Sequence, residues 1–413
     1  MRQLGKGRKE LAMKNWIIPI LATVAVAGCN LENKQNIEAH QRWARTRACV
    51  ICGVGAEHLK VGDLDKATAS AAQALELDAD CVAGRLLMAK ALLEKGRYLR
   101  AAEHLHRAET HAPANAEVPY LLGVALEKRE QYDEALKHYQ KARALDPSND
   151  AYVTASAEAL AASGRSLLAL ELLETRLERT DGTPSMLALA GELAMLVEEP
   201  GKAVDYYHRC LDMQSENLSA REGLAKAYFF AGKHAEALGV LKSLAGQTRY
   251  AGKACWVYLI TGDCHMALNQ PRQAQVAYEQ AGRIEPGEPA IWVAQAKAAL
   301  AAGDVARARI AARRALTLKP AGRDAQVVLA YALLAEGKPA EAAGLLKASP
   351  AEAAGDPTVL CVLGRCYASM GRKDQAVSCY LRALRSNPED PLAKRLLARA
   401  GLESEAMHYS ERM

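Results

Sequence analysis

The 413-residue sequence has none of the short motifs that mark common catalytic centres. It lacks a Gly-x-Ser-x-Gly elbow, a phosphate-binding loop and the His-Glu-x-x-His pattern that holds zinc. No stretch stands apart as a separate domain large enough to enclose an active site. We therefore expect neither an enzyme nor a cofactor or metal site.

Blocks of basic residues are also missing. The chain has 53 Lys and Arg against 48 Asp and Glu, but five basic residues and one acidic residue lie within 1–29, so residues 30–413 carry 48 against 47. A nucleic-acid-binding surface needs a basic stripe or patch, because binding is favoured when its Lys and Arg side chains release counterions from the phosphates. A nucleic-acid partner is therefore not expected.

The ten cysteines do not form the paired spacing of a zinc site. Cys49 and Cys52 make a single Cys-x-x-Cys, no second pair follows it, and Gly53 stands where a haem attachment site has histidine. Cysteine often serves as a small buried side chain. We prefer that interpretation, and keep a redox pair and half of a metal site as its alternatives.

What the sequence does have is a 34-residue period. Prolines recur at this step, with one slip of three residues before Pro286, and an alanine lies twelve residues before each of them. The prolines are Pro113, Pro147, Pro286, Pro320 and Pro388, and the alanines are Ala101, Ala135, Ala274, Ala308 and Ala376. A fixed period of this length predicts an array of stacked repeats.

Each period reads as two amphipathic helices. In one copy, the pattern predicts a helix from Glu117 to Arg129 and a second from Tyr132 to Leu145. Gly123 and Ala135 are small, which lets the two helix axes approach closely, and Tyr139 fills the volume beside them. Pro147 then ends the second helix, because proline disfavours helix at the preceding residue.

In each copy a small residue such as Gly123 is followed after twelve residues by an alanine and after twelve more by a proline. This pattern resembles the tetratricopeptide repeat family. The resemblance implies an all-α, right-handed superhelical solenoid of about ten helix-turn-helix units. We place units 1–6 at 48–251 and units 7–10 at 252–390, starting near Ala48, Val82, Ala116, Asp150, Pro184, Leu218, Cys255, Pro289, Arg323 and Pro357. Residues 391–402 are expected to form a capping helix, which such arrays need because the last unit has no neighbour. Residues 403–413 form a tail.

The amino terminus has the character of an export signal. A basic start is followed by an apolar run from Trp16 to Gly28, which is too short to span a bilayer. The run ends in Val26-Ala27-Gly28-Cys29, which resembles the bacterial lipoprotein cleavage box. We therefore expect a signal peptide at 1–29 and a tether at 30–47. The alternative is a short buried or interfacial helix that happens to end in cysteine.

The lipoprotein resemblance implies that Cys29 is acylated and holds the chain on a membrane through more than one lipid chain. It also implies a place in a bacterial cell envelope, facing the periplasm. Asn30, rather than aspartate, follows the acylated cysteine, and this favours the outer membrane over the inner one.

In the tetratricopeptide family the first helices line a groove at set positions. Carried onto this sequence, those positions give the expected partner-binding residues Tyr120, Lys226, Phe229, Phe230, Trp256, Leu259, Met266, Lys297, Tyr331 and Arg365. Glu127, Glu192, Asp263 and Val293 occupy further such positions. Aromatic and methionine side chains on such a surface suit an extended peptide or a partner helix. The alternative is that Phe229, Phe230 and Trp256 pack the irregular joint around Gly246–Gly252.

We therefore expect a membrane-anchored scaffold or adaptor that binds protein or peptide clients. Its layout resembles that of pilotin and pilus-assembly lipoproteins and of adaptor lipoproteins of the cell wall, so envelope assembly, secretion or pilus biogenesis is the expected setting. Two rivals stay open. In the first alternative the chain is a structural, self-assembling homo-oligomer of the envelope. In the second it is an adaptor with a Cys49–Cys52 redox pair.

Overall fold

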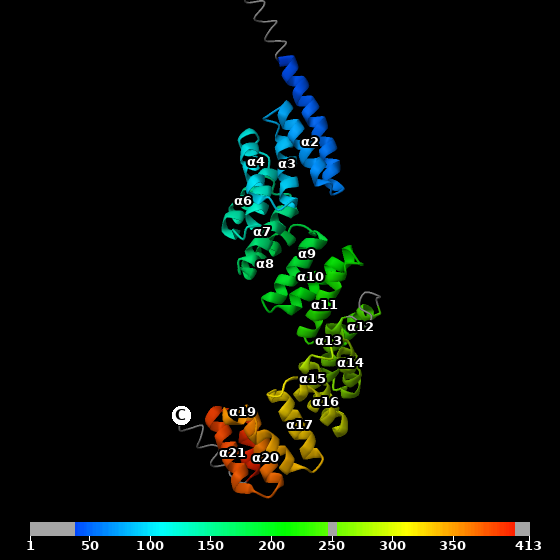
Figure 1. Ribbon diagram of the computed structural model, residues 1–413, viewed down its shortest axis with the longest axis vertical. Helices are drawn as coiled ribbons and strands as arrows, with labels where there is room; N and C mark the ends of the chain where they lie inside the picture. Colours follow the sequence, from blue (N-terminus) through cyan, green and yellow to red (C-terminus); the bar gives the residue numbers. More distant parts are fainter. Residues whose placement is uncertain (1–37, 247–253, 401–413) are drawn as a thin grey trace, which may run out of the picture. The chain divides into compact units, whose positions relative to one another are not determined.

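The computed structural model describes residues 38–246 and 254–400, and every regular element within these ranges is a helix (Figure 1). The chain divides into two compact units, residues 1–197 and 198–413, which we treat separately. Within each unit, helices that are consecutive in the sequence pack side by side.

The first unit begins with a helix over 38–60. Eight helices follow it, namely α2 (Leu64–Leu77), α3 (Val82–Glu94), α4 (Tyr98–His111), α5 (Glu117–Glu127), α6 (Tyr132–Leu145), α7 (Asp150–Ala162), α8 (Ser166–Leu177) and α9 (Pro184–Leu196).

The second unit begins with α10 (Pro200–Met213), α11 (Leu218–Phe230), α12 (His234–Ala245), α13 (Cys255–Ala267), α14 (Pro271–Ile284), α15 (Pro289–Ala301) and α16 (Val305–Leu318). It continues with α17 (Arg323–Ala335), α18 (Pro339–Lys347), the short α19 (Pro350–Ala353), α20 (Pro357–Ser369), α21 (Lys373–Ser386) and α22 (Pro391–Arg399).

The predicted fold class is confirmed: the chain is an all-α array of about ten helix-turn-helix units with a final helix, α22. From the second repeat on, the first helix of each repeat starts within one residue of the position predicted from the period. The second helix of the ninth repeat, α18, ends at Lys347 because Pro350 follows.

Two boundaries differ from the sequence interpretation. Residues 38–47, assigned to the tether, are helical and run without a break into the first repeat, since the stretch holds no glycine or proline. The Glu38–Arg42 ion pair of 3.6 Å and the Arg47 guanidinium, 5.2 Å from the Trp43 ring centroid, both join residues four apart along this helix. Residues 1–37, which include Cys29 and most of the stretch expected to form a signal peptide and tether, lie outside the described residues.

The division into compact units falls after Val197, not at 251/252. Repeats 6 and 7 stay together because Leu241 and Leu244 of α12 and Val257 and Cys264 of α13 share one buried cluster. The slip in the period at Gly246–Gly252 therefore does not separate two bodies. Residues 247–253 lie outside the described ranges.

Close packing of the two helices in a repeat depends on a glycine facing a tyrosine. A Cβ built on Gly123 would lie 2.4 Å from the Tyr139 ring, and one on Gly262 would lie 2.4 Å from Tyr278. In the tenth repeat, a Cβ built on Gly364 would lie 2.3 Å from the Tyr380 ring. No real side chain fits at these distances, so the small residue sets the helix–helix separation.

A second constraint lies in the turn between the two helices of each repeat. The same position has positive φ in every repeat, and glycine occupies it in seven of the ten. The other three positions hold Glu130 at φ 60°, Glu198 at φ 62° and Asn269 at φ 56°. Left-handed backbone favours glycine because an L side chain there meets the following carbonyl.

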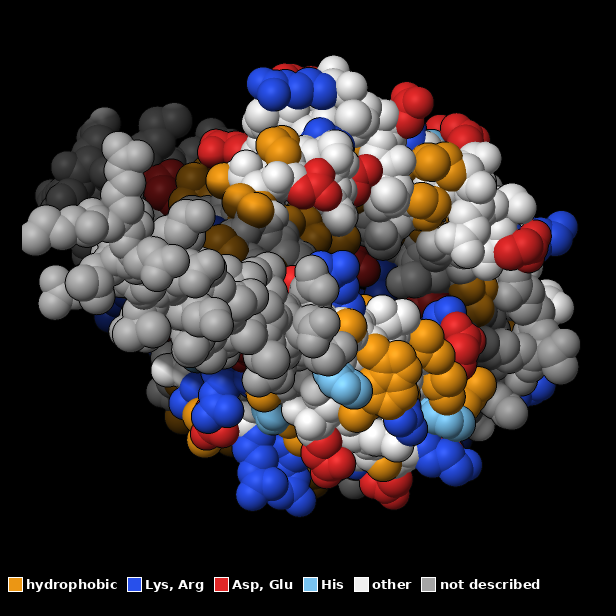
Figure 2. All heavy atoms as spheres, turned by 90° about the horizontal axis from the view of Figure 1, so that it is seen from above, with side chains coloured by type: hydrophobic (Ala, Val, Ile, Leu, Met, Phe, Trp, Pro, Cys, Tyr) orange, Lys and Arg blue, Asp and Glu red, His pale blue; other side chains and the backbone are white. Residues whose placement is uncertain are grey.

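The surface carries both signs of charge. In the view of Figure 2, basic, acidic and hydrophobic side chains intermingle over the visible described face. Among the described helices none is long and apolar enough to cross a membrane.

Candidate functional site

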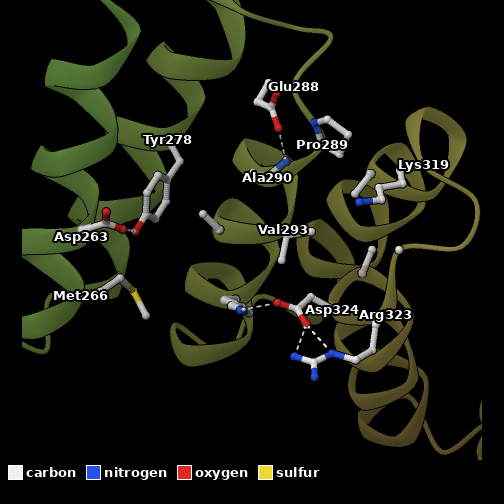
Figure 3. Close-up of a pocket in the computed structure, with 15 residues that line it drawn as sticks. Asp263, Met266, Tyr278, Glu288, Pro289, Ala290, Val293, Lys319, Arg323 and Asp324 are labelled. Carbon is white, nitrogen blue, oxygen red and sulfur yellow. Dashed lines mark hydrogen bonds and ion pairs between the residues drawn. The ribbon is translucent and has the colours of Figure 1, made fainter. Parts of the chain in front are cut away.

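The first helices of three successive repeats in the second unit enclose a cavity of about 740 Å³. Helices α13, α15 and α17 supply most of its wall, and the chain segments before α15 and α17 contribute Glu288, Lys319 and Gly322 (Figure 3). We call it the α13–α17 cavity. It is lined by Asp263, Met266, Tyr278, Glu288, Pro289, Ala290, Val293, Ala294, Lys297, Ala315, Lys319, Gly322, Arg323, Asp324 and Ala325.

One side of the cavity is an apolar surface with a fixed polar pair. The Tyr278 hydroxyl donates to Asp263 Oδ1 at 2.6 Å, and Figure 3 shows the two side chains pointing toward each other. Burial, and then this bond to a carboxylate, raise the pKa of Tyr278. Met266 and Ala294 pack next to the tyrosine ring. A ligand here therefore meets a rigid wall with a carboxylate already oriented.

The opposite side is a network of charges. Asp324 Oδ1 accepts from Arg323 at 2.7 Å, Lys297 lies 3.6 Å from the other oxygen of Asp324, and Arg323 also reaches Asp356 at 3.1 Å. The hydrogen bond from Arg323 lowers the pKa of the Asp324 carboxyl, so Asp324 stays ionised. These side chains are about half exposed, which makes the pairs easy to exchange for a ligand's charges.

The charge of the cavity is balanced. Three basic side chains, Lys297, Lys319 and Arg323, face three acidic ones, Asp263, Glu288 and Asp324. Glu288 is engaged at the start of α15, where its Oε1 accepts from the Ala290 N–H at 3.2 Å. Such a lining suits a dipolar segment, such as a peptide with charged side chains of both signs, better than an ion of one sign.

The predicted aromatic residues Phe229, Phe230 and Trp256 do not line the cavity. The two phenylalanines lie one repeat earlier, in α11, and Trp256 lies at the start of α13. Phe229 and Trp256 are partly buried and pack on the cluster of Leu241, Leu244 and Val257, so they do fill the joint between repeats 6 and 7. Phe230 is 65% exposed and meets Phe229 edge-on, with ring centroids 5.3 Å apart. The Lys226 ammonium lies 5.0 Å from the Trp256 ring centroid.

The other predicted residues of the second unit divide in two ways. Met266 and Lys297 line the cavity, whereas Leu259 packs into the core beside Tyr278. Arg365 of α20 lies 5.1 Å from the ring centroid of Tyr331 of α17, which forms a cation–π pair. The structure thus brings two of these nine residues together in the cavity, beside Asp263 and Val293 from the further groove positions, and leaves the other seven outside its lining.

Tyr120, the predicted residue of the first unit, belongs to a tyrosine cluster. Its ring centroid lies 5.9 Å from that of Tyr139 and 5.0 Å from that of Tyr152. The Tyr139 hydroxyl donates to Glu127 at 2.6 Å. Desolvation, and then repulsion by Glu127, raise the pKa of Glu158 on the next first helix. This face is acidic and aromatic, in contrast to the balanced α13–α17 cavity.

Several residues that line the α13–α17 cavity were not predicted from the sequence as partner-binding residues. Tyr278 occupies the position of Tyr139, for which the sequence predicted only a packing role, and its hydrogen bond to Asp263 depends on how the two helices of the repeat pack. Glu288, Lys319 and Arg323 lie at or beside the joins between repeats, where the family's groove positions make no prediction. Their approach to the cavity follows from the stacking of successive repeats.

The cysteine pair is poorly placed for redox chemistry. Cys49 is exposed, but Cys52 is buried, and burial together with the neighbouring Cys81 thiol raises the pKa of Cys52 to about 12. A thiol attacks only as its thiolate. The nine cysteines of the described ranges, including Cys366 and Cys379, are all free thiols.

Comparisons with known proteins agree with the repeat pattern. Family models described as "Tetratricopeptide repeat" match residues 55–116, 86–150, 120–184, 189–252 and 266–410. Together they span most of the chain. No curated protein matches the sequence.

Solved structures with a similar fold include the following three. A tetratricopeptide repeat protein from Parabacteroides merdae has 18% identity, with 61% of this chain and 98% of that chain covered and a TM-score of 0.42. The APC/C hetero-tetramer Cut9-Hcn1 has 17% identity, with 86% and 76% covered and a TM-score of 0.42. YrrB, described as a TPR protein with an unusual peptide-binding site, has 24% identity, with 41% and 88% covered and a TM-score of 0.34.

Proteins with this repeat are in general non-catalytic scaffolds that bind protein or peptide partners. The period, the glycine–tyrosine contacts within the repeats and the family matches agree along almost the whole chain. The chain belongs to the tetratricopeptide repeat family.

Proposed function

We propose that this chain is a lipid-anchored scaffold of a bacterial envelope that holds a protein client in the α13–α17 cavity. The observation that carries the proposal is the cavity itself, in which three successive first helices present an apolar wall opposite exchangeable ion pairs. A volume of about 740 Å³ holds a few side chains of an extended segment. Repeats on either side add the exposed Phe230 and the Arg365–Tyr331 pair.

The envelope setting rests on the amino-terminal sequence. Acylation at Cys29 would concentrate the scaffold at a membrane facing the periplasm, with the outer membrane favoured, and the cavity would then select the client. The layout resembles that of pilotin, pilus-assembly and wall-adaptor lipoproteins, and this resemblance supports a client in envelope assembly, secretion or pilus biogenesis. Labelled palmitate should enter the wild-type chain and not the Cys29→Ser variant; a wild-type chain without label would remove the anchor.

The groove is tested by photo-crosslinking in intact cells. A crosslinking amino acid at Val293, inside the cavity, should capture a defined client, and Lys297→Glu with Arg323→Glu should abolish that product. Lys242→Glu is the matched control, since Lys242 is an exposed lysine of α12 outside the cavity. Equal capture by the control and the cavity variant would reject the assignment. A Phe229→Ala, Phe230→Ala, Trp256→Ala variant shows whether the client also reaches the aromatic joint.

A further inference from the structure

A second groove lies on the second helices of repeats 7 and 8. It has a volume of about 1020 Å³, runs between α14 and α16, and shares no lining residue with the α13–α17 cavity. We call it the α14–α16 groove. The exposed apolar side chains Val276 and Ile310 stand on its two walls, at 60% and 65% exposure.

These two residues occupy the same position in successive repeats, 34 residues apart. The corresponding residues of the neighbouring repeats are Gly239, Gly344 and Ser378, so large apolar side chains at this position are confined to the groove. Exposed apolar side chains that cluster on a monomer and are rimmed by charge are typical of an interaction site.

The floor of the groove is a fixed tryptophan. Trp292 is buried, its indole N–H donates to the Pro286 carbonyl at 3.0 Å, and a Cβ on Gly282 would lie 3.0 Å from its ring. The Arg314 guanidinium lies over the Trp292 ring, 3.8 Å from its centroid. A guanidinium stacked in this way keeps its edge N–H groups free to bind a carboxylate with two hydrogen bonds.

The groove has an excess of positive charge. Its two acidic residues are already neutralised within it, because Glu279 pairs with Arg283 at 2.7 Å and Asp304 pairs with Arg307 at 3.3 Å. Arg272 and Arg314 make no ion pair within the described part of the chain. Arg307, Ile310 and Arg314 are three and four residues apart and therefore share one face of α16.

We propose that the α14–α16 groove docks an acidic amphipathic segment of a protein partner, with its apolar side chains between Val276 and Ile310 and its carboxylates on Arg272 and Arg314. This binding goes beyond the proposed function, because it uses the opposite helices of the repeats and does not depend on the α13–α17 cavity. Apolar anchors combined with arginines are typical of helix-in-groove recognition. A nucleic acid is less suited, because the one aromatic ring of the groove is already covered and cannot stack on a base.

The test uses the full chain and a fluorescein-labelled synthetic helix with leucine on one face and glutamate elsewhere. Fluorescence anisotropy should show binding that is lost when lysine replaces glutamate or alanine replaces leucine in the peptide. Arg272→Glu and Ile310→Asp should each weaken binding about tenfold or more. Both residues are exposed, so these variants should fold, which circular dichroism checks.

Arg313→Glu is the matched control, since Arg313 is exposed on α16, makes the same change of charge and does not line the groove. It should alter the affinity less than about twofold. The proposal is overturned if Arg313→Glu weakens binding as much as Arg272→Glu, or if the lysine peptide binds equally well. It is also overturned if phosphatidylglycerol vesicles or duplex DNA bind more tightly than the peptide and lose binding with the same variants, or if the variants change only self-association.

Discussion

The hydroxyl of Tyr278 and the carboxylate of Asp263 meet at 2.6 Å across the two helices of one repeat. Tyr278 reaches that position because Gly262 leaves room for its ring. In the first unit, Tyr139 lies against Gly123 in the same way and donates to Glu127, a carboxylate one helical turn further along the first helix. The contact that sets the spacing of the helices thus also delivers a polar group to the face that they expose.

Replacing Gly262 with alanine should destabilise the protein. The new methyl group would lie 2.4 Å from the Tyr278 ring and force the two helices apart, which costs about 1–3 kcal/mol. Urea unfolding followed by circular dichroism measures the change. Gly239→Ala is the control, because a Cβ there meets nothing within 4 Å and should stabilise α12 by up to about 1 kcal/mol. Equal effects of the two changes would contradict the packing role of Gly262.

Replacing Glu130 with glycine should stabilise the protein. Glu130 has φ 60° at a turn where seven repeats have glycine, and relief of the left-handed strain is worth about 1 kcal/mol. The midpoint of urea unfolding should therefore rise. Glu134→Gly, four residues later within α6, should lower it by about the same amount because glycine disfavours helix. A Glu130→Gly variant no more stable than the wild type would show that the turn is not strained.

Replacing Glu158 with glutamine should stabilise the protein at neutral and alkaline pH. Desolvation and the nearby Glu127 raise the folded-state pKa of Glu158, so the folded state binds this proton more tightly than the unfolded state does. Protonation of Glu158 therefore contributes to the free energy of unfolding. This contribution is fully present below the unfolded-state pKa of about 4.3 and is lost as the pH rises through the folded-state pKa. The glutamine variant escapes the loss.

Unfolding free energies measured between acidic and alkaline pH check this sign. The difference in unfolding free energy between Glu158→Gln and the wild type should grow as the pH rises through the folded-state pKa of Glu158 and then level off. Glu134→Gln, at an exposed site of α6, serves as the control for removal of a charge. An advantage that is the same at every pH would mean that glutamine acts through packing and not through the titration of Glu158.

Alkylation should separate Cys49 from the buried thiols. Cys49 is exposed, whereas Cys52 is buried and its pKa of about 12 leaves little thiolate at neutral pH. Iodoacetamide should therefore react quickly with Cys49 in the folded chain, and the fast phase should vanish in Cys49→Ser. Formation of a Cys49–Cys52 disulfide under mild oxidant would contradict this and revive the redox rival.

Much of the fold could be predicted because it depends on local, repeated signals. The starts of the first helices followed from the prolines and small residues, which act within one repeat and its neighbour. The extension of the first helix over 38–47 was missed because these turns lack the repeat's small residues and are held by local pairs such as Arg47 over Trp43. The left-handed turn position was hidden because Glu130, Glu198 and Asn269 replace its glycine.

The candidate site was less predictable. The family's groove positions led to Asp263, Met266, Val293 and Lys297. Tyr278, in contrast, comes from a second helix, and Arg323 comes from the start of repeat 9. Phe229 and Trp256 also occupy groove positions of the family, but they are partly buried in the joint between repeats 6 and 7. A position in a repeat gives the direction of a side chain, whereas its exposure depends on the size of the side chains around it.

The sequence by itself determined the family, the number of repeats and the places where their helices start, because those features follow from periodic patterns read along the chain. Only the tertiary structure decided where the surface is hollow and how its charges are paired. The α13–α17 cavity and the α14–α16 groove are each assembled from residues of successive repeats, and pairs such as Arg323 with Asp356 join side chains 33 positions apart. Such pairs depend on how one repeat stacks on the next.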